Sequence, residues 1–420
     1  MRSLRIAVWH NLPTGGGKRA LHMHVKGLHA RGHRIRIYST TAAAHHYLPL
    51  APYAESEALL SLPPAPTLQR SLARRLIPTG FRSEPAEARI AMVQQMKLLC
   101  QQSAAMIEKD GCDLLFANSS INTFNSPIGT FVQLPSVIYL GEPNRSFYEA
   151  SPRLPWLLPK TPTAHPRNPV KRAMDRSREL HQNHAYRVQA TEELNWATSY
   201  DHILCNSQFS RESILRAYGL DSHVCYLGID SEQFRPVARA KAGFVVSVGS
   251  IYYGKRLEAS IMAIASIPKP VRPKFLWIGN FADDWYKRYI IELAQQHDVN
   301  LEVKVLVSDQ DLQNAMSEAA CFIYTPQLEP FGLTPLEANA CGTAVVAIGE
   351  GGVRETIREG INGFVTIDND PKILGELIVR FTSDLEYATR MGVQAREHVI
   401  KNWGVKDAID RLEQRLLASV

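Results

Sequence analysis

The chain has 420 residues and a formal net charge of +6; 45% of its residues are hydrophobic and 21% are charged. This length is enough for two domains with full cores, and the composition is typical of soluble globular proteins. No apolar run approaches the roughly 18 residues of a membrane span, and Ile6–Trp9 is too short for a signal peptide. We therefore expect a cytoplasmic protein.

Strand and helix patterns alternate through the first half of the chain. An amphipathic helix is expected near residues 20–31, where Gly32 stops it. The predicted strands are Leu4–His10, Ile35–Tyr38, Leu114–Ala117, Ser136–Leu140 and Ile203–Cys205. Such alternation predicts a parallel sheet wound with crossover helices.

A second series of strands begins after Gly243. Its predicted strands are Phe244–Val248, Phe275–Ile278, Leu301–Val305, Cys321–Thr325, Ala344–Ile348 and Phe364–Thr366. The segment 234–239 is a plausible hinge between the two series. We therefore predict an α/β protein with an N-terminal domain over 1–235, joined by the final helix at 404–420, and a C-terminal domain over 236–403. Each half has the size of a doubly wound, Rossmann-like domain, and two such domains facing across a cleft would bind a ligand there.

Cysteines and histidines lack metal-binding spacing. None of the six cysteines forms a CxxC pair, which favours reduced, buried thiols, and the 14 histidines show no supporting pattern. Asp368-Asn369-Asp370 precedes a proline and a helix, so we expect a turn and a helix cap rather than a metal site. No interleaved pattern of basic and aromatic residues indicates nucleic-acid binding.

Positive charge is concentrated between Ser151 and Ala190. This segment has a net charge of +6, from eight basic residues, Arg153, Lys160, Arg167, Lys171, Arg172, Arg176, Arg178 and Arg187, against Asp175 and Glu179. It also contains Trp156-Leu157-Leu158. Such a stretch suits an anionic membrane surface or an acidic acceptor, and the alternative is a solvated loop.

The most informative stretch runs from Glu329 to Glu337 (EPFGLTPLE) and places two carboxylates around a glycine turn. Thr334 is expected to cap a short helix that has Pro335 first and Glu337 third. The turn gathers Glu329 and several backbone N–H groups at a helix start, which suits a phosphorylated ligand. For Glu337 two interpretations stay open: a ligand contact, or a capping box with Thr334.

Two further segments follow predicted strands. Gly15-Gly16-Gly17 lets the backbone approach a phosphate, although it matches neither the P-loop nor GxGxxG, and a flexible turn is the alternative. The segment 247–256 brings Lys255 or Arg256 toward the carboxyl edge of its sheet, where ligands bind. In Asn206-Ser207-Gln208-Phe209-Ser210, Ser210 is expected to cap a helix.

Taken together, these motifs resemble the retaining glycosyltransferases of family four, which have the GT-B fold. The resemblance covers nearly the whole chain. It is strongest over residues 305–367, with Ser308-Asp309-Gln310-Asp311-Leu312 and Gly351-Gly352-Val353-Arg354-Glu355, and good over 205–236, with Asn206-Ser207 and Gly228-Ile229-Asp230.

The resemblance implies a role for each matching residue. Glu329 would hold hydroxyls of the donor sugar, Glu337 the ribose hydroxyls, and Lys255 would neutralise the diphosphate. The remaining positions would supply backbone contacts: those of Phe331, Gly332 and Leu333 near sugar and phosphate, those of Gly16 or Gly17 in a closing loop, and those of Leu306 and Val307 beside the nucleobase.

The sequence departs from the family pattern at two positions. Ser250 stands where many relatives have Arg, so Arg256 or Lys255 would supply the charge. Gly141 stands where relatives often have a His that contacts the donor sugar and the reaction centre, and Glu142 is our candidate for its substitute. The expected catalytic residues are therefore Glu329, Lys255 and Glu142.

The resemblance implies transfer of a sugar from a nucleotide-diphosphate sugar to an acceptor hydroxyl, with retention and without a metal or a further cofactor. It also implies that the domain over 1–235 is the acceptor side and that the domain over 236–403 binds the nucleotide-sugar donor. The donor could be a UDP-, GDP- or ADP-sugar. The acceptor could be a carbohydrate, a lipid-linked intermediate or a small molecule, as in surface polysaccharide or glycolipid assembly, with 151–190 placing the protein peripherally at the inner face of the membrane. Two alternatives stay open: another nucleotide-sugar enzyme, such as an epimerase or phosphorylase, and a non-catalytic subunit that binds sugar nucleotides.

Overall fold

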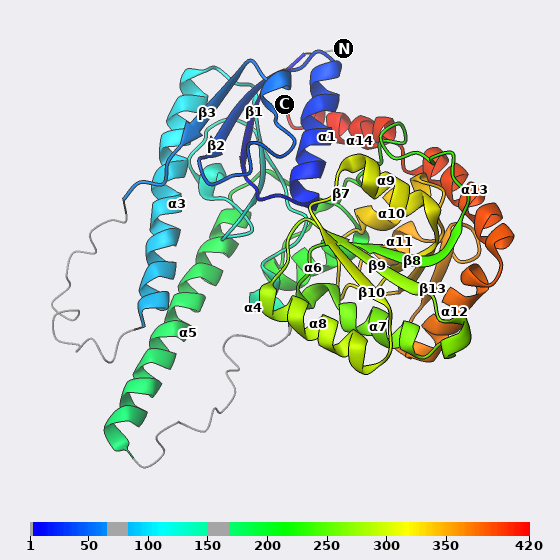
Figure 1. The fold of residues 1–420 in the computed structure, drawn as a ribbon. Coiled ribbons are helices and arrows are strands. Elements are labelled where there is room, and N and C mark those ends of the chain that lie inside the picture. The colour runs from blue at the N-terminus through cyan, green and yellow to red at the C-terminus, as the bar shows by residue number, and fades with distance from the viewer. Residues whose placement is uncertain (1–2, 65–82, 150–167) are drawn as a thin grey trace. The chain divides into compact units, whose positions relative to one another are not determined.

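The computed structural model describes residues 3–64, 83–149 and 168–420 (Figure 1). Within them the chain forms two compact units. Unit 1 takes Met1–Cys205, Arg211–Val224 and Leu412–Val420, and unit 2 takes Asn206–Ser210 and Cys225–Arg411. The chain therefore enters the second unit briefly at residues 206–210, enters it again at Cys225, and returns to the first unit at Leu412.

Unit 1 is built on a parallel sheet of seven strands in the order β3-β2-β1-β4-β5-β6-β7. Its strands are β1 (Arg5–Asn11), β2 (Arg34–Thr40), β3 (Ser56–Leu60), β4 (Leu114–Ser120), β5 (Ser136–Tyr139), β6 (His202–Cys205) and β7 (His223–Val224). Its described α-helices are α1 (Gly16–Ala30), α3 (Glu84–Lys109), α4 (Arg145–Tyr148), α5 (Pro169–Ala197) and most of α6 (Gln208–Tyr218). The sheet order reverses beside β1, which is the doubly wound topology.

Helices cover both faces of this sheet, so its central strand β1 contains a continuous apolar run. Ile6, Ala7, Val8 and Trp9 of β1 are all fully buried. One face packs a core that includes Ala7 and Trp9 against α3, and α3 and α5 lie side by side (Figure 1).

Unit 2 contains a parallel sheet of six strands in the order β10-β9-β8-β11-β12-β13. Its strands are β8 (Ala242–Val248), β9 (Lys274–Gly279), β10 (Leu301–Val305), β11 (Ala319–Tyr324), β12 (Val345–Ile348) and β13 (Gly363–Thr366). Its helices are α7 (Leu257–Ala265), α8 (Asp284–Gln296), α9 (Asp309–Glu318), α10 (Leu333–Ala340), α11 (Val353–Thr356), α12 (Pro371–Thr382), α13 (Leu385–Asn402) and the first half of α14 (Val405–Ala418).

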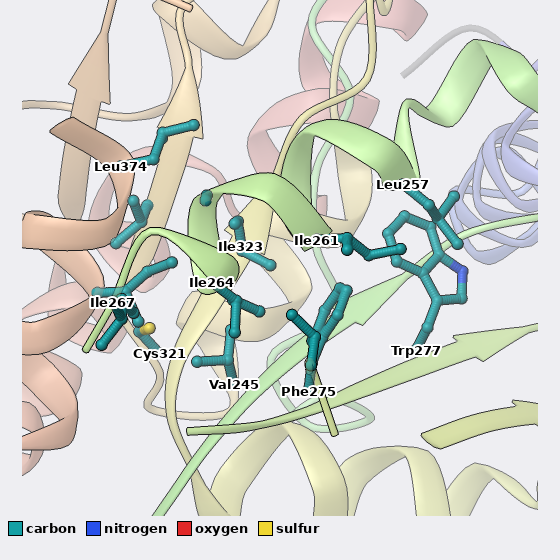
Figure 2. Packing of buried hydrophobic residues seen from close by; sticks show 14 of the residues in the cluster. Val245, Leu257, Ile261, Ile264, Ile267, Phe275, Trp277, Cys321, Ile323 and Leu374 are labelled. Atoms are coloured by element: carbon teal, nitrogen blue, oxygen red, sulfur yellow. The ribbon is translucent and has the colours of Figure 1, made fainter. Parts of the chain in front are cut away.

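The core of unit 2 lies between its sheet and helix α7. Leu257, Ile261 and Ile264 recur at helical spacing along α7 and are fully buried. Figure 2 shows them beside Phe275 and Trp277 of β9, in one cluster. This packing fixes where the strands of the sheet end, and so fixes the loops that follow them.

The predicted fold class is confirmed: both halves are α/β with parallel sheets. The first helix begins at Gly16, four residues earlier than expected, so two of the three glycines lie inside it. Unit 2 begins at Cys225 rather than near residue 236, and it also takes residues 206–210. That two domains face each other across a cleft stays a prediction.

The basic segment 151–190 is described only in part. Residues 150–167, with Trp156, Arg153, Lys160 and Arg167, lie outside the described residues. Residues 169–190 belong to α5, so this part is helix and not a loop. In the described part of the chain, no helix has both the length and the apolar character to cross a membrane.

Candidate functional site

The expected donor-binding residues gather at the carboxyl edge of the second sheet. Ser250 and Lys255 follow β8, Leu306 and Val307 follow β10, and Glu329 follows β11. In a parallel sheet these loops share one edge, which is where ligands of doubly wound domains bind. The packing of the sheet therefore brings together residues that are up to about 80 positions apart in sequence.

Lys255 and Glu329 are in direct contact. Lys255 Nζ donates a hydrogen bond to Glu329 Oε2 at 2.6 Å, and both side chains are largely buried. A charge-assisted bond between partly desolvated groups is stronger than one on the surface. The carboxylate and the ammonium group lie on separate motifs in the sequence, and the fold brings them into contact.

Two glycines hold the Glu329 loop in place. Gly352 N–H donates to Glu329 O at 2.8 Å. A Cβ at Gly351 would lie 2.2 Å from Glu329 O, and one at Gly352 would lie 2.2 Å from Pro330 O. No side chain fits at either position, so the backbone of the loop rests directly on the glycines.

Helix α10 begins differently from the prediction. Gly332, at φ 88°, is its N-cap, Leu333 is its first residue, and no side chain caps it. The predicted Thr334 cap, and with it the capping box, is wrong: Thr334 lies second in the helix and Glu337 fifth. Glu337 is only 2% exposed, so capping does not explain this buried carboxylate.

Phe331 anchors the turn before α10. Its ring is 3% exposed and packs against Trp403, at 5.7 Å between centroids, and against Tyr226, at 6.4 Å. The backbone N–H groups that follow Phe331 therefore start from a fixed position at the positive end of the helix.

Arg256 and Ser250 have partners of their own. Arg256 donates to Glu350 Oε1 and to Asn369 Oδ1, both at 3.0 Å. Ser250 donates to Asn280 Oδ1 at 2.8 Å. Lys255 is thus the cation bound to Glu329, whereas Arg256 is bound to the loops that follow β12 and β13.

The backbone around this edge is strained. Arg256, Leu306 and Leu328 have φ of 51°, 58° and 51°, a region that costs non-glycine residues energy and that is common at functional sites. Leu306 is also 78% exposed, which leaves an apolar surface available where a nucleobase was expected. Val307 lines an open cavity of about 400 Å³, which the other expected site residues do not line.

The remaining expected residues belong to unit 1. Gly16 and Gly17 form the first turn of α1, and the neighbouring Lys18 is 1% exposed. Burial lowers the pKa of Lys18 to about 8. Glu142 follows β5, with its Oε2 at 3.4 Å from Arg145 Nε. Gly16, Gly17 and Glu142 thus share the carboxyl edge of the first sheet and are not in the same unit as Glu329.

Several positioning residues were missed. Ser207 Oγ donates to Pro330 O at 2.5 Å and accepts from Ser210 N–H, so Ser207 caps α6 and the predicted Ser210 cap is wrong. Glu355 accepts hydrogen bonds from Gln208 N–H and Tyr226 Oη. The only signal for these links was the presence of Asn206-Ser207 and Gly351–Glu355 as motifs far apart in the sequence.

Asp370, in the Asp368-Asn369-Asp370 segment, has a structural role. Asp370 caps α12 by accepting from Lys372 N–H at 2.9 Å, as predicted. Within the three described ranges, no group of three or more His, Cys, Asp or Glu residues is arranged to hold a metal ion.

Comparison with known proteins identifies the class. Residues 229–398 match the family model "Glycosyl transferases group 1". The fold is similar to that of sucrose-phosphate synthase from Thermosynechococcus elongatus (TM-score 0.69, 19% identity, 100% of both chains). It is also similar to HepE from Anabaena in complex with UDP-glucose (TM-score 0.69, 17% identity, 99% of this chain and 100% of that one). The protein therefore has the GT-B glycosyltransferase fold.

Curated relatives are similar at lower coverage. D-inositol 3-phosphate glycosyltransferase 1 of Catenulispora acidiphila is 24% identical over 50% of this chain and 56% of its own length. Human alpha-1,3/1,6-mannosyltransferase ALG2 is 26% identical over 49% of this chain and 57% of its own length. The chain thus spans a little over half the length of these relatives. The match to the group 1 glycosyl transferases covers residues 229–398, and the suspected resemblance to GT-B glycosyltransferases is confirmed.

Proposed function

We propose that the protein transfers a sugar from a nucleotide-diphosphate sugar to an acceptor hydroxyl, with retention at the anomeric carbon. The observation that carries this proposal is the 2.6 Å contact between Lys255 and Glu329 beside the start of α10. It combines a cation, a hydroxyl-binding carboxylate and backbone N–H groups, which are what a sugar diphosphate requires.

In this reaction the bond between the anomeric carbon and the diphosphate breaks as the bond to the acceptor oxygen forms. Negative charge builds on the departing diphosphate, where Lys255 and the N–H groups of α10 stabilise it. Glu329 orients the sugar hydroxyls and Glu337 binds the ribose. The acceptor's proton passes to the leaving phosphate, so attack occurs on the face that the diphosphate leaves.

We take UDP-sugars as the first donors to test, because HepE, a structure of similar fold, was solved with UDP-glucose. GDP- and ADP-sugars follow. As the acceptor we propose a carbohydrate or a lipid-linked intermediate. We also propose that the protein is cytoplasmic and binds peripherally to the inner face of the membrane. Support comes from the exposed bases on α5: Lys171, Arg172, Arg176 and Arg178.

The test is a thermal-shift screen of UDP-, GDP- and ADP-sugars, followed by product analysis with the donor that binds. We expect release of nucleoside diphosphate in proportion to glycoside formed, an α-linked product from an α-linked donor, and unchanged turnover in EDTA. An epimerised sugar, or a sugar phosphate made without an acceptor, would favour the other nucleotide-sugar enzymes. Binding without turnover across acceptors would favour the non-catalytic subunit.

A further inference from the structure

Helix α1 of unit 1 buries a lysine on its apolar face. Lys18, Leu21, Val25 and Leu28 recur at helical spacing and are at most 1% exposed. A hydrophobic residue at the first of these positions would complete the apolar stripe. A lysine is costly there, because burial takes water away from its ammonium group. The stability of the helix therefore does not explain Lys18.

Lys18 also lies at the positive end of α1. It belongs to the first turn, which contains no acidic residue and is not capped by a side chain. Glu57 raises the pKa of Lys18 through its charge, without a hydrogen bond, but burial outweighs this effect and lowers the pKa to about 8. The ammonium group is thus still protonated at pH 7, beside the free N–H groups of the helix start. A bound anion would stabilise both.

Two further buried side chains have a donor without a partner. His10 is fully buried, and its Nδ1 accepts from Leu12 N–H at 3.5 Å, so the ring proton is assigned to Nε2. Asn118 is 3% exposed. Within the described residues, neither His10 Nε2 nor Asn118 Nδ2 has a hydrogen-bond partner. Buried polar groups are rarely left unpaired, so these two donors indicate a missing acceptor.

Both side chains lie on the side of the sheet that α1 covers. Asn118 is paired with Tyr139 of β5, whose ring lies 4.8 Å from that of His24 on α1, measured between centroids. Burial lowers the pKa of His10, and the charge of Lys18 lowers it further, which places these two residues within electrostatic range of each other. The pairing of β1 with β4 also shifts by one residue at His10, and such bulges often redirect a side chain beside a functional site.

These groups share one chemical property, because all of them donate hydrogen bonds. They are an ammonium, an imidazole N–H, an amide NH₂ and the backbone N–H groups of an uncapped helix. A phosphate monoester offers only acceptors, on three terminal oxygens that point in different directions, and helix starts favour such anions. The donor's diphosphate has its own proposed partners in unit 2, at Lys255 and the start of α10.

We propose that Lys18, His10 and Asn118 bind the phosphate group of a phosphorylated sugar, which is the acceptor. The phosphate does not react; it holds the sugar so that one of its hydroxyls is presented for transfer. The inference rests on the proposed function and deepens it, because it assigns the acceptor a chemical class and places its recognition in unit 1.

The test is calorimetric titration of the full chain, saturated with the nucleoside diphosphate that binds best. The titrants are glucose 6-phosphate, mannose 6-phosphate and N-acetylglucosamine 6-phosphate, each compared with its neutral sugar. We expect at least one sugar phosphate to bind about tenfold more tightly than the neutral sugar, the value of one charge-assisted hydrogen bond. Inorganic phosphate should compete with it.

Lys18→Met removes the charge and keeps the length of the side chain. This variant should bind the sugar phosphate and the neutral sugar equally, without a lower Tm, because an apolar residue suits this position. Asn118→Leu is the second variant and should weaken sugar phosphate binding several-fold, and it decides the question if Lys18→Met does not fold. The matched control is Lys26→Met, on the exposed side of the same helix, which should keep the preference for phosphate.

Three results would overturn the inference: no sugar phosphate binds better than its neutral sugar, the preference survives both Lys18→Met and Asn118→Leu, or Lys18→Met weakens nucleoside diphosphate binding equally. The last result would assign Lys18 to the donor. If the wild type binds the nucleotide but shows no preference for phosphate, the acceptor site fails while the proposed function stands. If the wild type does not bind any nucleotide, the proposed function itself fails.

Discussion

Glu329 and Lys255 are the residues on which the proposed chemistry depends most. Each is largely buried, and each has the other at 2.6 Å. A buried charge that loses its partner is costly, so substitution of either one changes more than its own contact. Glu329→Gln is therefore a better probe than Glu329→Ala, because glutamine keeps the size of the side chain and an acceptor oxygen for Lys255.

We predict that Glu329→Gln lowers kcat about a hundredfold, while affinity for the nucleoside diphosphate changes little. The reason is that Glu329 is proposed to contact the sugar rather than the nucleotide, and a lost transition-state contact of this kind costs about 3 kcal/mol. Steady-state kinetics and calorimetric titration with the nucleotide measure the two effects separately.

The control is Glu386→Gln, which removes a carboxylate paired with Arg390 in the same unit and away from the candidate site residues. It should leave both kcat and nucleotide affinity unchanged. Equal losses in the two variants would show that Glu329 supports the unit in general rather than the reaction.

For Glu337 we expect the opposite result to Glu329: substitution should affect nucleotide binding. Because it is the fifth residue of α10 and does not cap the helix, Glu337→Gln should leave the Tm nearly unchanged. Loss of the ribose contact proposed for Glu337 should weaken nucleotide binding about tenfold, which corresponds to about 1.4 kcal/mol. A lower Tm with full nucleotide affinity would instead assign Glu337 a purely structural role.

Substitution of Gly352 tests whether the close contact between the segment after β12 and the Glu329 loop positions the site. Gly352→Ala would set a Cβ 2.2 Å from Pro330 O, which forces the Glu329 loop to move and should cost about 2 kcal/mol of stability. We expect a lower Tm and weaker donor binding. Gly243→Ala is the control, because the nearest heavy atom to its Cβ is 4.0 Å away; it should change neither, and similar losses in both variants would contradict this account of the loop.

Glu193 on α5 makes unit 1 sensitive to pH. It is fully buried; its Oε1 accepts from Gln189 and Asn144, and its Oε2 has no hydrogen-bond partner. Burial raises the pKa of Glu193 to about 8 from 4.5, although Gln189, Asn144 and Arg89 oppose the shift; Tyr148 and Tyr218 also face it. Below pH 4.5 the acid is neutral in both folded and unfolded chains, so it adds no pH dependence.

Between pH 4.5 and about 8 only the unfolded chain ionises at this position, so folding stability falls as pH rises. The slope is on the order of 1.4 kcal/mol per pH unit. Glu193→Gln, which imitates the neutral acid, should therefore leave the Tm unchanged at pH 5 and raise it at pH 8. If the difference in Tm between variant and wild type were the same at both pH values, Glu193 would not be the titrating group.

Most central strands could be predicted from the sequence because they are buried on both faces and appear as continuous apolar runs. Edge strands β3 and β7 could not: β3 mixes Glu57 with exposed Leu59, and β7 has only two residues. The start of α10 was mistaken because a Thr-x-x-Glu pattern indicates a capping box, whereas Gly332 alone can adopt φ 88° at the turn.

At the scale of the whole molecule, the last helix, α14, returns to unit 1 and contacts the segment between α1 and β2. Glu413 of α14 bonds to Arg31 and, at 2.9 Å, to the buried His33, all within unit 1. We predict that Glu413→Ala lowers stability by about 2 kcal/mol, since it leaves two cationic or polar partners without an acceptor. Thermal unfolding measures the loss. Glu386→Ala removes an exposed pair with Arg390 at 3.8 Å and should have almost no effect; equal effects would contradict a special role for Glu413.

The residues of the candidate site stay predictions, and their assembly could not be predicted. The roles of Lys255, Glu329 and Glu337 were implied by the resemblance to the family, on motifs that are separate in the sequence. The contact between Lys255 and Glu329, and the support of Pro330 by Ser207, join segments more than 70 positions apart. Only the tertiary fold determines such pairings.

The central claim is that unit 2 binds a nucleotide sugar at the carboxyl edge of its sheet. Hydrogen–deuterium exchange of the full chain, with and without the nucleoside diphosphate that binds best, tests it most directly. The account predicts slower exchange in residues 250–256, 305–308 and 329–337, and a smaller change at these segments with Glu337→Gln when the nucleotide concentration is close to the Kd of the wild type. Slower exchange confined to other segments, or none with UDP, GDP or ADP, would contradict it.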